Sequence, residues 1–153
     1  NEYKQFGGNF EVLHHTEMIE KLIESGKIEL KASEEKINTT YHDSCYLGRY
    51  NSVYNSPRSS LSKIDGLELT EMARNKSKGF CCGAGGGRMF LEDEEGGRIN
   101  VERTKEALST NPDTIASACP FCMTMLTDGV KHFEKTDVVS VKDIAEIILE
   151  NSK

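Results

Sequence analysis

Five cysteines carry the clearest chemical signal in this chain of 153 residues. They stand as a single Cys45, an adjacent pair Cys81 and Cys82, and the CxxC spacing of Cys119 and Cys122. Cysteine thiolates are soft ligands that select zinc, copper(I) or iron–sulfur clusters. A closed structural zinc site needs four ligands, usually in two local pairs, and five cysteines in three groups exceed that need. The pattern therefore favours an iron–sulfur cluster, with zinc as the alternative.

Three further roles for the cysteines are less favoured. Five thiols cannot all pair with one another and no secretory leader opens the sequence, so a disulfide framework is disfavoured. Free cysteine also packs as a small, inert hydrophobic residue. A CxxC at a helix start is typical of thioredoxin-like redox sites, because the helix N-terminus favours the thiolate. The three cysteines outside the CxxC favour a metal centre over both of these.

A glycine-rich run follows Cys82 directly, over residues 83–87, with Ala84 as the one residue in it that is not glycine. No regular element tolerates such a run, so the backbone is expected to bend sharply or to approach another group closely. Its backbone N–H groups can point at the sulfur atoms of a cluster. A nucleotide-binding loop is disfavoured, because Arg88 replaces the last glycine of GxGxxG and the Walker lysine is absent. The residues expected to contact the cofactor are Gly83, Gly85, Gly86 and Gly87.

His42 lies three residues before Cys45 and is the one candidate for a catalytic side chain. It can donate a hydrogen bond to a cluster sulfur or contact a thiol substrate. The alternative is a histidine at a strand end that bonds only to backbone. Arg49, Arg88 and Arg98 are candidates to offset negative charge at the cluster, or else ordinary solvated side chains. The adjacent His14 and His15 do not share a helix face and so do not form a metal site.

The elements that must position these residues follow from apolar periodicity and from glycine and proline breaks. Cys119 is expected at a helix N-cap, with Pro120 in the first helical position. We expect helices over residues 10–25, 57–65, 98–109, 120–133 and 141–150. We expect strands or extended segments over residues 37–42, 67–71, 113–118 and 138–139.

Short strands that alternate with helices predict an α/β fold, with a mostly parallel sheet flanked by helices. Each cysteine group follows a predicted strand. Because parallel strands bring their C-terminal ends to one edge of a sheet, we expect the cysteines to gather in loops at that edge. Convergence of the three groups is the step on which the site depends.

Composition narrows the class of protein. Hydrophobic residues make up 37% and charged residues 29%, and the formal net charge is −6. An acidic chain is a poor partner for nucleic acid or for an anionic membrane, and no apolar run approaches the roughly 20 residues that span a bilayer. The acidic residues 92–95 are expected to form an exposed turn or a partner contact. Since the chain starts at Asn1 rather than Met, we expect a piece of a longer polypeptide.

The order and spacing of Cys45, Cys81-Cys82-Gly83 and Cys119-Pro120-Phe121-Cys122 resemble the cysteine-rich CCG domain of the heterodisulfide reductase family. Within that family, residues 42–49, 80–89 and 118–126 are similar to the C-terminal domain of bacterial iron–sulfur oxidoreductases associated with electron-transfer flavoprotein. The similarity runs from about Phe6 to Ile148, so residues 1–153 are expected to form one CCG-type domain of a larger oxidoreductase.

The resemblance implies a [4Fe-4S] cluster, of cubane or non-cubane form, held by the cysteines Cys45, Cys81, Cys82, Cys119 and Cys122. It implies a partner domain of the same type, a ferredoxin-like domain and, in some relatives, a membrane anchor. The expected location is the cytoplasm. For relatives whose full-length protein is anchored, it is the cytoplasmic face of the membrane. Some CCG domains bind zinc instead.

Three functions follow from the resemblance. The first is electron transfer between electron-transfer flavoprotein and the quinone pool. The second is reduction of a disulfide at the cluster, as in heterodisulfide reductases. The third, from another class, is a zinc-stabilised interaction module.

Overall fold

The computed structural model describes residues 2–33, 35–91 and 97–153. Its centre is a sheet of four parallel strands, in the spatial order β2-β1-β3-β4. The strands are β1 (Ile37–Tyr41), β2 (Leu67–Leu69), β3 (Thr114–Ser117) and β4 (Ser140–Asp143). The predicted α/β class with a parallel sheet flanked by helices is confirmed.

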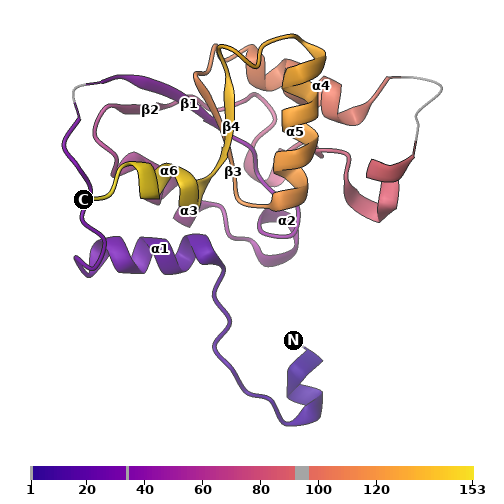
Figure 1. Ribbon diagram of the computed structural model, residues 1–153. Coiled ribbons are helices and arrows are strands. Elements are labelled where there is room, and N and C mark those ends of the chain that lie inside the picture. Colours follow the sequence, from indigo (N-terminus) through magenta and orange to yellow (C-terminus); the bar gives the residue numbers. More distant parts are fainter. Residues whose placement is uncertain (1, 34, 92–96) are drawn as a thin grey trace.

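Helices cover both faces of the sheet (Figure 1). One face carries α1 (His15–Glu24), α3 (Asn55–Ser62) and α6 (Ile144–Glu150), which contact one another. The other carries α4 (Ile99–Leu108) and α5 (Pro120–His132), which also pack together. Short elements complete the described chain: η1 (Glu2–Phe6), α2 (Gly48–Asn51), η2 (Lys76–Lys78) and η3 (Gly85–Phe90).

The apolar core is divided by the sheet into two clusters. Leu61, Ile64 and Ile147 belong to the cluster under α1, α3 and α6. Leu126 and Val130 belong to the cluster under α4 and α5. Because apolar side chains are buried on both faces of the sheet, the hydrophobic effect stabilises the three layers.

Two predicted helix starts were wrong, and side-chain caps explain both. The first helix begins at His15 rather than at residue 10, because the His14 ring accepts a hydrogen bond from the Thr16 N–H and Glu17 accepts one from the His14 N–H. The last helix begins at Ile144 rather than at residue 141. There Asp143 accepts a hydrogen bond from the Ala145 N–H.

The last strand was also misplaced. It was predicted at residues 138–139, but β4 begins at Ser140, which pairs with Thr114 of β3. The Val139 N–H closes a turn on the Lys135 carbonyl at 2.9 Å and so is not available to the sheet. Val138 is exposed. The β-branched side chain of Val138 therefore misled the assignment, since strand propensity does not show whether a neighbouring strand is present to pair with.

The other predicted elements lie within a few residues of their bounds, whereas α2 and the short helices η1, η2 and η3 were not predicted. No helix in the described ranges has both the length and the apolarity needed to cross a membrane. The acidic residues 92–95, for which an exposed turn or a partner contact was predicted, lie outside the described residues.

Candidate metal centre

Two of the three cysteine groups leave the two central strands of the sheet. Cys45 lies in the turn that follows β1, four residues after Tyr41. Cys119 follows β3 at two residues after Ser117. The chain runs from β1 to β2 on one side and later to β3 on the other, so β1 and β3 flank the point where the strand order reverses. Ligands of open α/β sheets bind outside the carboxyl ends of the strands at this switch point.

The third group reaches the same place by a longer route. Cys81 and Cys82 come twelve or more residues after the end of β2, beyond the short helix η2. Cys82 and Cys122 are buried, and the other three cysteines are half-buried. Four cysteines stand in loops or turns as predicted, whereas Cys122 lies in the first turn of α5. Cys119 is the N-cap of that helix and Pro120 opens it, as the sequence predicted.

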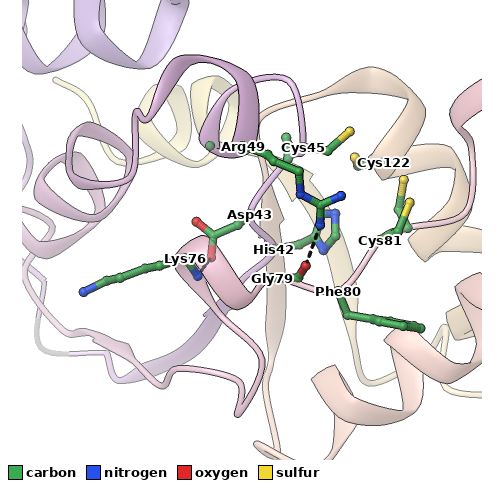
Figure 2. A pocket seen from close by; sticks show the side chains of 12 residues that line it. His42, Asp43, Cys45, Arg49, Lys76, Gly79, Phe80, Cys81 and Cys122 are labelled. Carbon is green, nitrogen blue, oxygen red and sulfur yellow. Dashed lines mark hydrogen bonds between the residues drawn. The ribbon is translucent and has the colours of Figure 1, made fainter.

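All five cysteines border two adjoining hollows that have Cys45, Cys82 and Cys122 in common. Figure 2 shows the narrower one, where the sulfur atoms of Cys45, Cys81 and Cys122 face the same region. The other is a cavity of about 290 Å³ that Cys119 also lines. The three distant segments thus meet in space.

The thiols influence one another strongly. Hydrogen bonding to Cys122 lowers the pKa of Cys82 to about 4 against the opposing effect of burial, and His42 adds to the lowering. Hydrogen bonding to Cys122 also lowers the pKa of Cys119 to about 6, helped by backbone N–H groups at the start of α5. The pKa of Cys122 is raised, because its proton is shared with both neighbours. Cys82 and Cys119 therefore favour the thiolate form that binds metals.

Cys45 differs from these two. Burial and the charges of Cys81 and Cys82 raise its pKa. Several thiolates in one hollow repel one another, and a bound cation relieves that repulsion. The electrostatics of the hollow therefore favour a positively charged inorganic centre.

The glycines next to the pair have two separate roles. Gly83 has a φ of +92°, and a Cβ there would lie 3.1 Å from the Ile99 Cβ at the start of α4. Its N–H donates to the Cys81 Sγ at 3.3 Å. The exposed Gly85, Gly86 and Gly87 line the 290 Å³ cavity and have open space around them. Gly83 therefore shapes the turn, while the other three leave the mouth of the cavity free of side chains.

The loop after β1 is fixed by an aspartate that does not stand out in the sequence. Asp43 accepts hydrogen bonds from both Nη atoms of Arg58 at 2.8 Å and from the Lys76 N–H at 2.6 Å. Lys76 begins η2, so this carboxylate ties the Cys45 loop to the segment that leads to Cys81. Arg58 also pairs with Glu71, after β2. Only the fold brings these residues together, since local sequence gives no signal for the contact.

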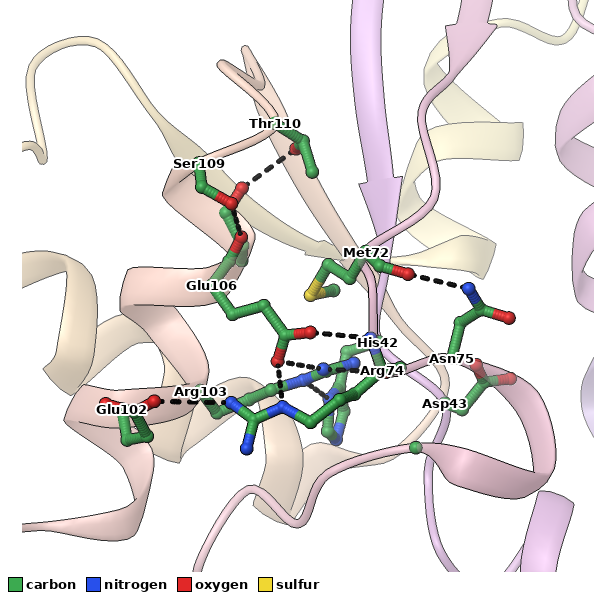
Figure 3. A network of polar contacts seen from close by, with 12 residues as sticks. His42, Asp43, Met72, Arg74, Asn75, Glu102, Arg103, Glu106, Ser109 and Thr110 are labelled. Carbon is green, nitrogen blue, oxygen red and sulfur yellow. Dashed lines mark hydrogen bonds and ion pairs between the residues drawn. The ribbon is translucent and has the colours of Figure 1, made fainter.

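His42 is buried against a second charged network, on α4. The Nε atom of Arg103 lies 2.9 Å from Nδ1 of His42, and Arg103 Nη1 lies 2.9 Å from the Glu106 carboxylate (Figure 3). Burial, followed by Arg103, lowers the pKa of His42 despite the opposing effect of Cys82, so the ring is neutral. Neither Arg103 nor Glu106 was predicted to belong to the site.

Not every candidate arginine reaches the site. Arg49 lines the narrow hollow and its Nη2 donates to the Gly79 carbonyl at 3.1 Å. All three arginines are exposed, but Arg88, on the glycine-rich segment, and Arg98, the N-cap of α4, line neither of the two hollows. The placement therefore favours Arg49 over the other two as a charge partner of the centre.

The donor set discriminates between one metal ion and a cluster. Among the described residues, the one group of three or more ligand atoms lying within 4.8 Å of one another is His42, Cys82 and Cys122. A tetrahedral zinc site needs four donors, each about 2.3 Å from the ion for sulfur. The remaining cysteines are close but more widely spread, which suits a centre several atoms across. The residues therefore fit an iron–sulfur cluster better than a single zinc ion.

Comparison with known proteins gives independent support. Residues 39–127 match the family model CCG, described as a cysteine-rich domain. The chain is 49% identical over 151 residues to the probable iron-sulfur-binding oxidoreductase FadF of Bacillus subtilis, covering 99% of this chain and 21% of that protein. It is 49% identical over 156 residues to the EtfAB:quinone oxidoreductase of Syntrophomonas wolfei, covering 97% of this chain and 21% of that protein.

A more distant relative is a subunit of the dihydromethanophenazine:CoB–CoM heterodisulfide reductase of Methanosarcina barkeri. It is 43% identical over 141 residues, which cover 92% of this chain and 34% of that protein. The chain thus spans about a fifth to a third of the length of these curated relatives.

Proposed function

This chain belongs to the CCG family of cysteine-rich domains, and on that premise we propose that its five cysteines hold an iron–sulfur cluster. The observation that carries the proposal is the meeting of Cys45, Cys81, Cys82, Cys119 and Cys122 around two adjoining hollows at the switch point of the sheet. A bound cluster of this kind supplies one-electron redox chemistry. We propose a [4Fe-4S] composition, which the number of thiols supports.

We further propose that the chain is an electron-transfer domain of a larger oxidoreductase that links electron-transfer flavoprotein to quinone. The name of the Bacillus subtilis relative supports an iron–sulfur oxidoreductase, and the name of the Syntrophomonas wolfei relative supports the link to quinone. The small share of their length that the chain spans supports a domain of a larger protein. The chain's own residues would hold the cluster, lower the pKa of two thiols and present a cavity mouth lined by glycine. Such an open mouth gives a short path for an electron to reach a partner.

Anaerobic purification with iron and sulfide analysis tests the cluster directly. We expect a brown protein with nearly equal iron and labile sulfide, and an EPR signal after reduction with dithionite. A colourless protein that holds one tightly bound zinc and loses its fold on chelation would overturn the proposal.

Variants sharpen that test. We expect Cys82→Ser to lose at least as much iron as Cys45→Ser, and Cys81→Ser likewise, because the pair lies between the other groups and Cys82 is buried with Cys122. Thr124→Ala is the matched control, since Thr124 is exposed on the same helix as Cys122. Equal iron content in all four variants would contradict the assignment.

A second candidate, reduction of a disulfide, has one observation in its favour. A largely apolar cavity of about 630 Å³ borders Cys119 and is walled by Tyr46, Leu47 and Phe121. A small disulfide seated there would take two electrons from dithionite and two protons, and would leave as two thiols. We expect the EPR spectrum of the iron-loaded chain to change when such a disulfide is added, if this candidate is correct. An unchanged spectrum across a panel of small asymmetric disulfides would reject it.

A further inference from the structure

The ring of His42 is held from one side by a residue that can only donate. His42 and Arg103 are both almost completely buried, and Arg103 Nε lies 2.9 Å from Nδ1 of His42. A guanidinium carries no acceptor, so Nδ1 must accept this hydrogen bond through its lone pair. The network therefore assigns the ring proton to Nε2.

Arg103 cannot easily turn away from the ring, because its Nη1 atom is anchored by two acceptors. Its Nη1 donates to the Arg74 carbonyl and to Glu106 Oε2, both at 2.9 Å. Glu106 in turn accepts from the N–H and the Nε of Arg74, at 2.6 and 2.9 Å (Figure 3). A bonded chain of this kind fixes the tautomer of His42 as firmly as it fixes the side chain of Arg103.

The opposite side of the ring faces sulfur. A ring nitrogen of His42, Cys82 Sγ and Cys122 Sγ all lie within 4.8 Å of one another. Since Nδ1 is engaged by Arg103, Nε2 is the ring nitrogen with a free direction, and it carries a proton. By residue type and proximity alone, His42 would count as a metal ligand beside the two cysteines.

The tautomer excludes that role. A histidine that binds a metal uses a lone pair and donates its other N–H to a carboxylate, a carbonyl or water. Here the neighbour of Nδ1 is itself a donor, which is the reverse arrangement. Ligation through Nε2 would require loss of its proton while the lone pair of Nδ1 is still engaged by Arg103.

From this geometry, and resting on the proposed iron–sulfur function, we infer that His42 is not a ligand but the hydrogen-bond donor to the sulfur of Cys82, with Arg103 as the positioning residue that fixes its tautomer. A hydrogen bond to a ligand sulfur stabilises the more negative, reduced state of a cluster and raises its reduction potential. The buried charge of Arg103 acts in the same direction, and its Nη2 finds no partner among the described residues. His42 and Arg103 together set the potential of the centre upward.

Pulsed EPR on the iron-loaded chain, grown with histidine labelled at Nε2 with nitrogen-15, tests the inference without any substitution. The other three histidines are His14, His15 and His132. None of them lines the two hollows that share Cys45, Cys82 and Cys122, and His14 lines the separate cavity beside Cys119. We expect a weak nitrogen coupling together with a proton coupling that disappears in D2O. A strong coupling typical of direct ligation would overturn the inference, and so would the absence of any histidine coupling.

Two substitutions of His42 separate the donor role from a purely structural one. Asparagine keeps an acceptor near the position of Nδ1 for Arg103 but cannot reach the sulfur, whereas glutamine places an N–H near the position of Nε2. We expect His42→Asn to have a more negative reduction potential than the wild type, and His42→Gln to restore most of the difference. His132→Phe, at an exposed position on α5, serves as the control and should leave the potential unchanged.

Iron content, measured first on the unsubstituted chain, separates the proposed function from the role of His42. A wild type without iron would overturn both the proposed function and this inference. A wild type with full iron content, and a His42→Asn variant with equal iron content and the same potential, would overturn the inference alone. If His42→Asn fails to retain iron, the nitrogen-15 measurement on the wild type decides.

Discussion

The helices α4 and α6 bury residues at the same spacing, but the buried side chains are mostly polar on α4 and apolar on α6. On α6 the buried residues are Ile144, Ile147 and Ile148, which are all apolar. On α4 they are Asn100, Arg103, Thr104 and Ala107, at the same spacing of three and four residues. Both faces pack inward, and on α4 Arg103 bonds to His42 beside Cys82 and Cys122.

The polar residues on the buried face of α4 lower the stability of the fold, and they do so next to the cysteine site. Asn100 Oδ1, Thr104 Oγ1 and Arg103 Nη2 are buried with no hydrogen-bond partner in the described part of the chain. An unsatisfied buried polar group costs about 1–3 kcal/mol, and an isoleucine in its place would instead contribute burial of apolar surface. The polar face of α4 is therefore explained by what it holds, His42 and Glu106, rather than by core packing.

Introducing the same residue at the equivalent position of each helix gives the largest expected contrast. Arg103→Met leaves Glu106 without its buried partner and should destabilise the chain by about 3–5 kcal/mol. Ile147→Met conserves volume in an apolar cluster and should cost less than about 1.5 kcal/mol. Urea unfolding at pH 7, followed by circular dichroism, measures both. Equal losses would show that the polar face of α4 contributes no more than ordinary packing.

Glu106 makes the contrast depend on pH. Burial would raise its pKa, but the Arg74 N–H and the charge of Arg103 outweigh burial and lower it. The carboxylate therefore stabilises the fold above the ordinary glutamate pKa of about 4.3, and that contribution is lost as the pH falls through the lower folded value. We expect Glu106→Gln to cost about 2 kcal/mol at pH 7, the typical worth of hydrogen bonds to a charged group.

The same variant should come closer to the wild type in acid. Once Glu106 is protonated, the wild type has also lost its charged acceptor, so the difference in unfolding free energy should shrink as the pH falls below about 4. Urea unfolding at several pH values, on wild type and Glu106→Gln in parallel, supplies the curve. A difference that stays constant between pH 7 and the acid limit would contradict the assigned sign.

The contact between α4 and α5 offers a smaller test. Gly129 of α5 lies against α4 so closely that an added Cβ would collide with the side chain of Thr104. Gly129→Ala should destabilise the chain by about 1–2 kcal/mol, because overpacking outweighs the better helix propensity of alanine. Gly85→Ala, with nothing within 4 Å of the added Cβ, is the control and should be nearly neutral. A stabilised Gly129→Ala variant would show that α4 moves aside at no cost.

The comparison of α4 with α6 also shows what the sequence could predict. Parallel strands share an edge for their C-terminal ends, so the meeting of Cys45 with Cys119 followed from the order of elements alone. A helix was likewise predicted over residues 141–150, and α6 (Ile144–Glu150) lies within that range. These features depend on local pattern and on topology, and both can be read along the chain.

The network behind the cysteines could not be read in that way. Arg103 and His42 are 61 residues apart, and an arginine among polar neighbours is usually solvated. The helix α4 was predicted from Val101, Ala107 and Leu108. Of these only Ala107 is on the buried face, which otherwise carries Asn100, Arg103 and Thr104. Hydrophobic periodicity cannot detect a buried face made of polar residues, since burial there depends on partners supplied by the fold.

The smallest expected effect is at the start of α6, where a carboxylate has a role that a neutral residue can take over. Asp143 accepts hydrogen bonds from the Ala145 N–H at 2.8 Å and lies 3.1 Å from His15 Nε2. Although burial opposes it, contact with His15 and with the Ala145 N–H lowers the pKa of Asp143. Asparagine is an equally good N-cap, and its amide can donate to the His15 ring.

Asp143→Asn should therefore change stability at pH 7 by no more than about 0.5 kcal/mol, since surface ion pairs contribute about that much. Its unfolding free energy should fall less steeply than that of the wild type as the pH drops below about 3.9, because the wild type alone loses a charged cap there. Urea unfolding of Asp143→Asn and of Glu106→Gln, each at pH 7 and at a pH below about 3.9, compares the two helices directly. A loss at pH 7 as large as that of Glu106→Gln would mean that the carboxylate capping α6 is as specialised as the one on α4.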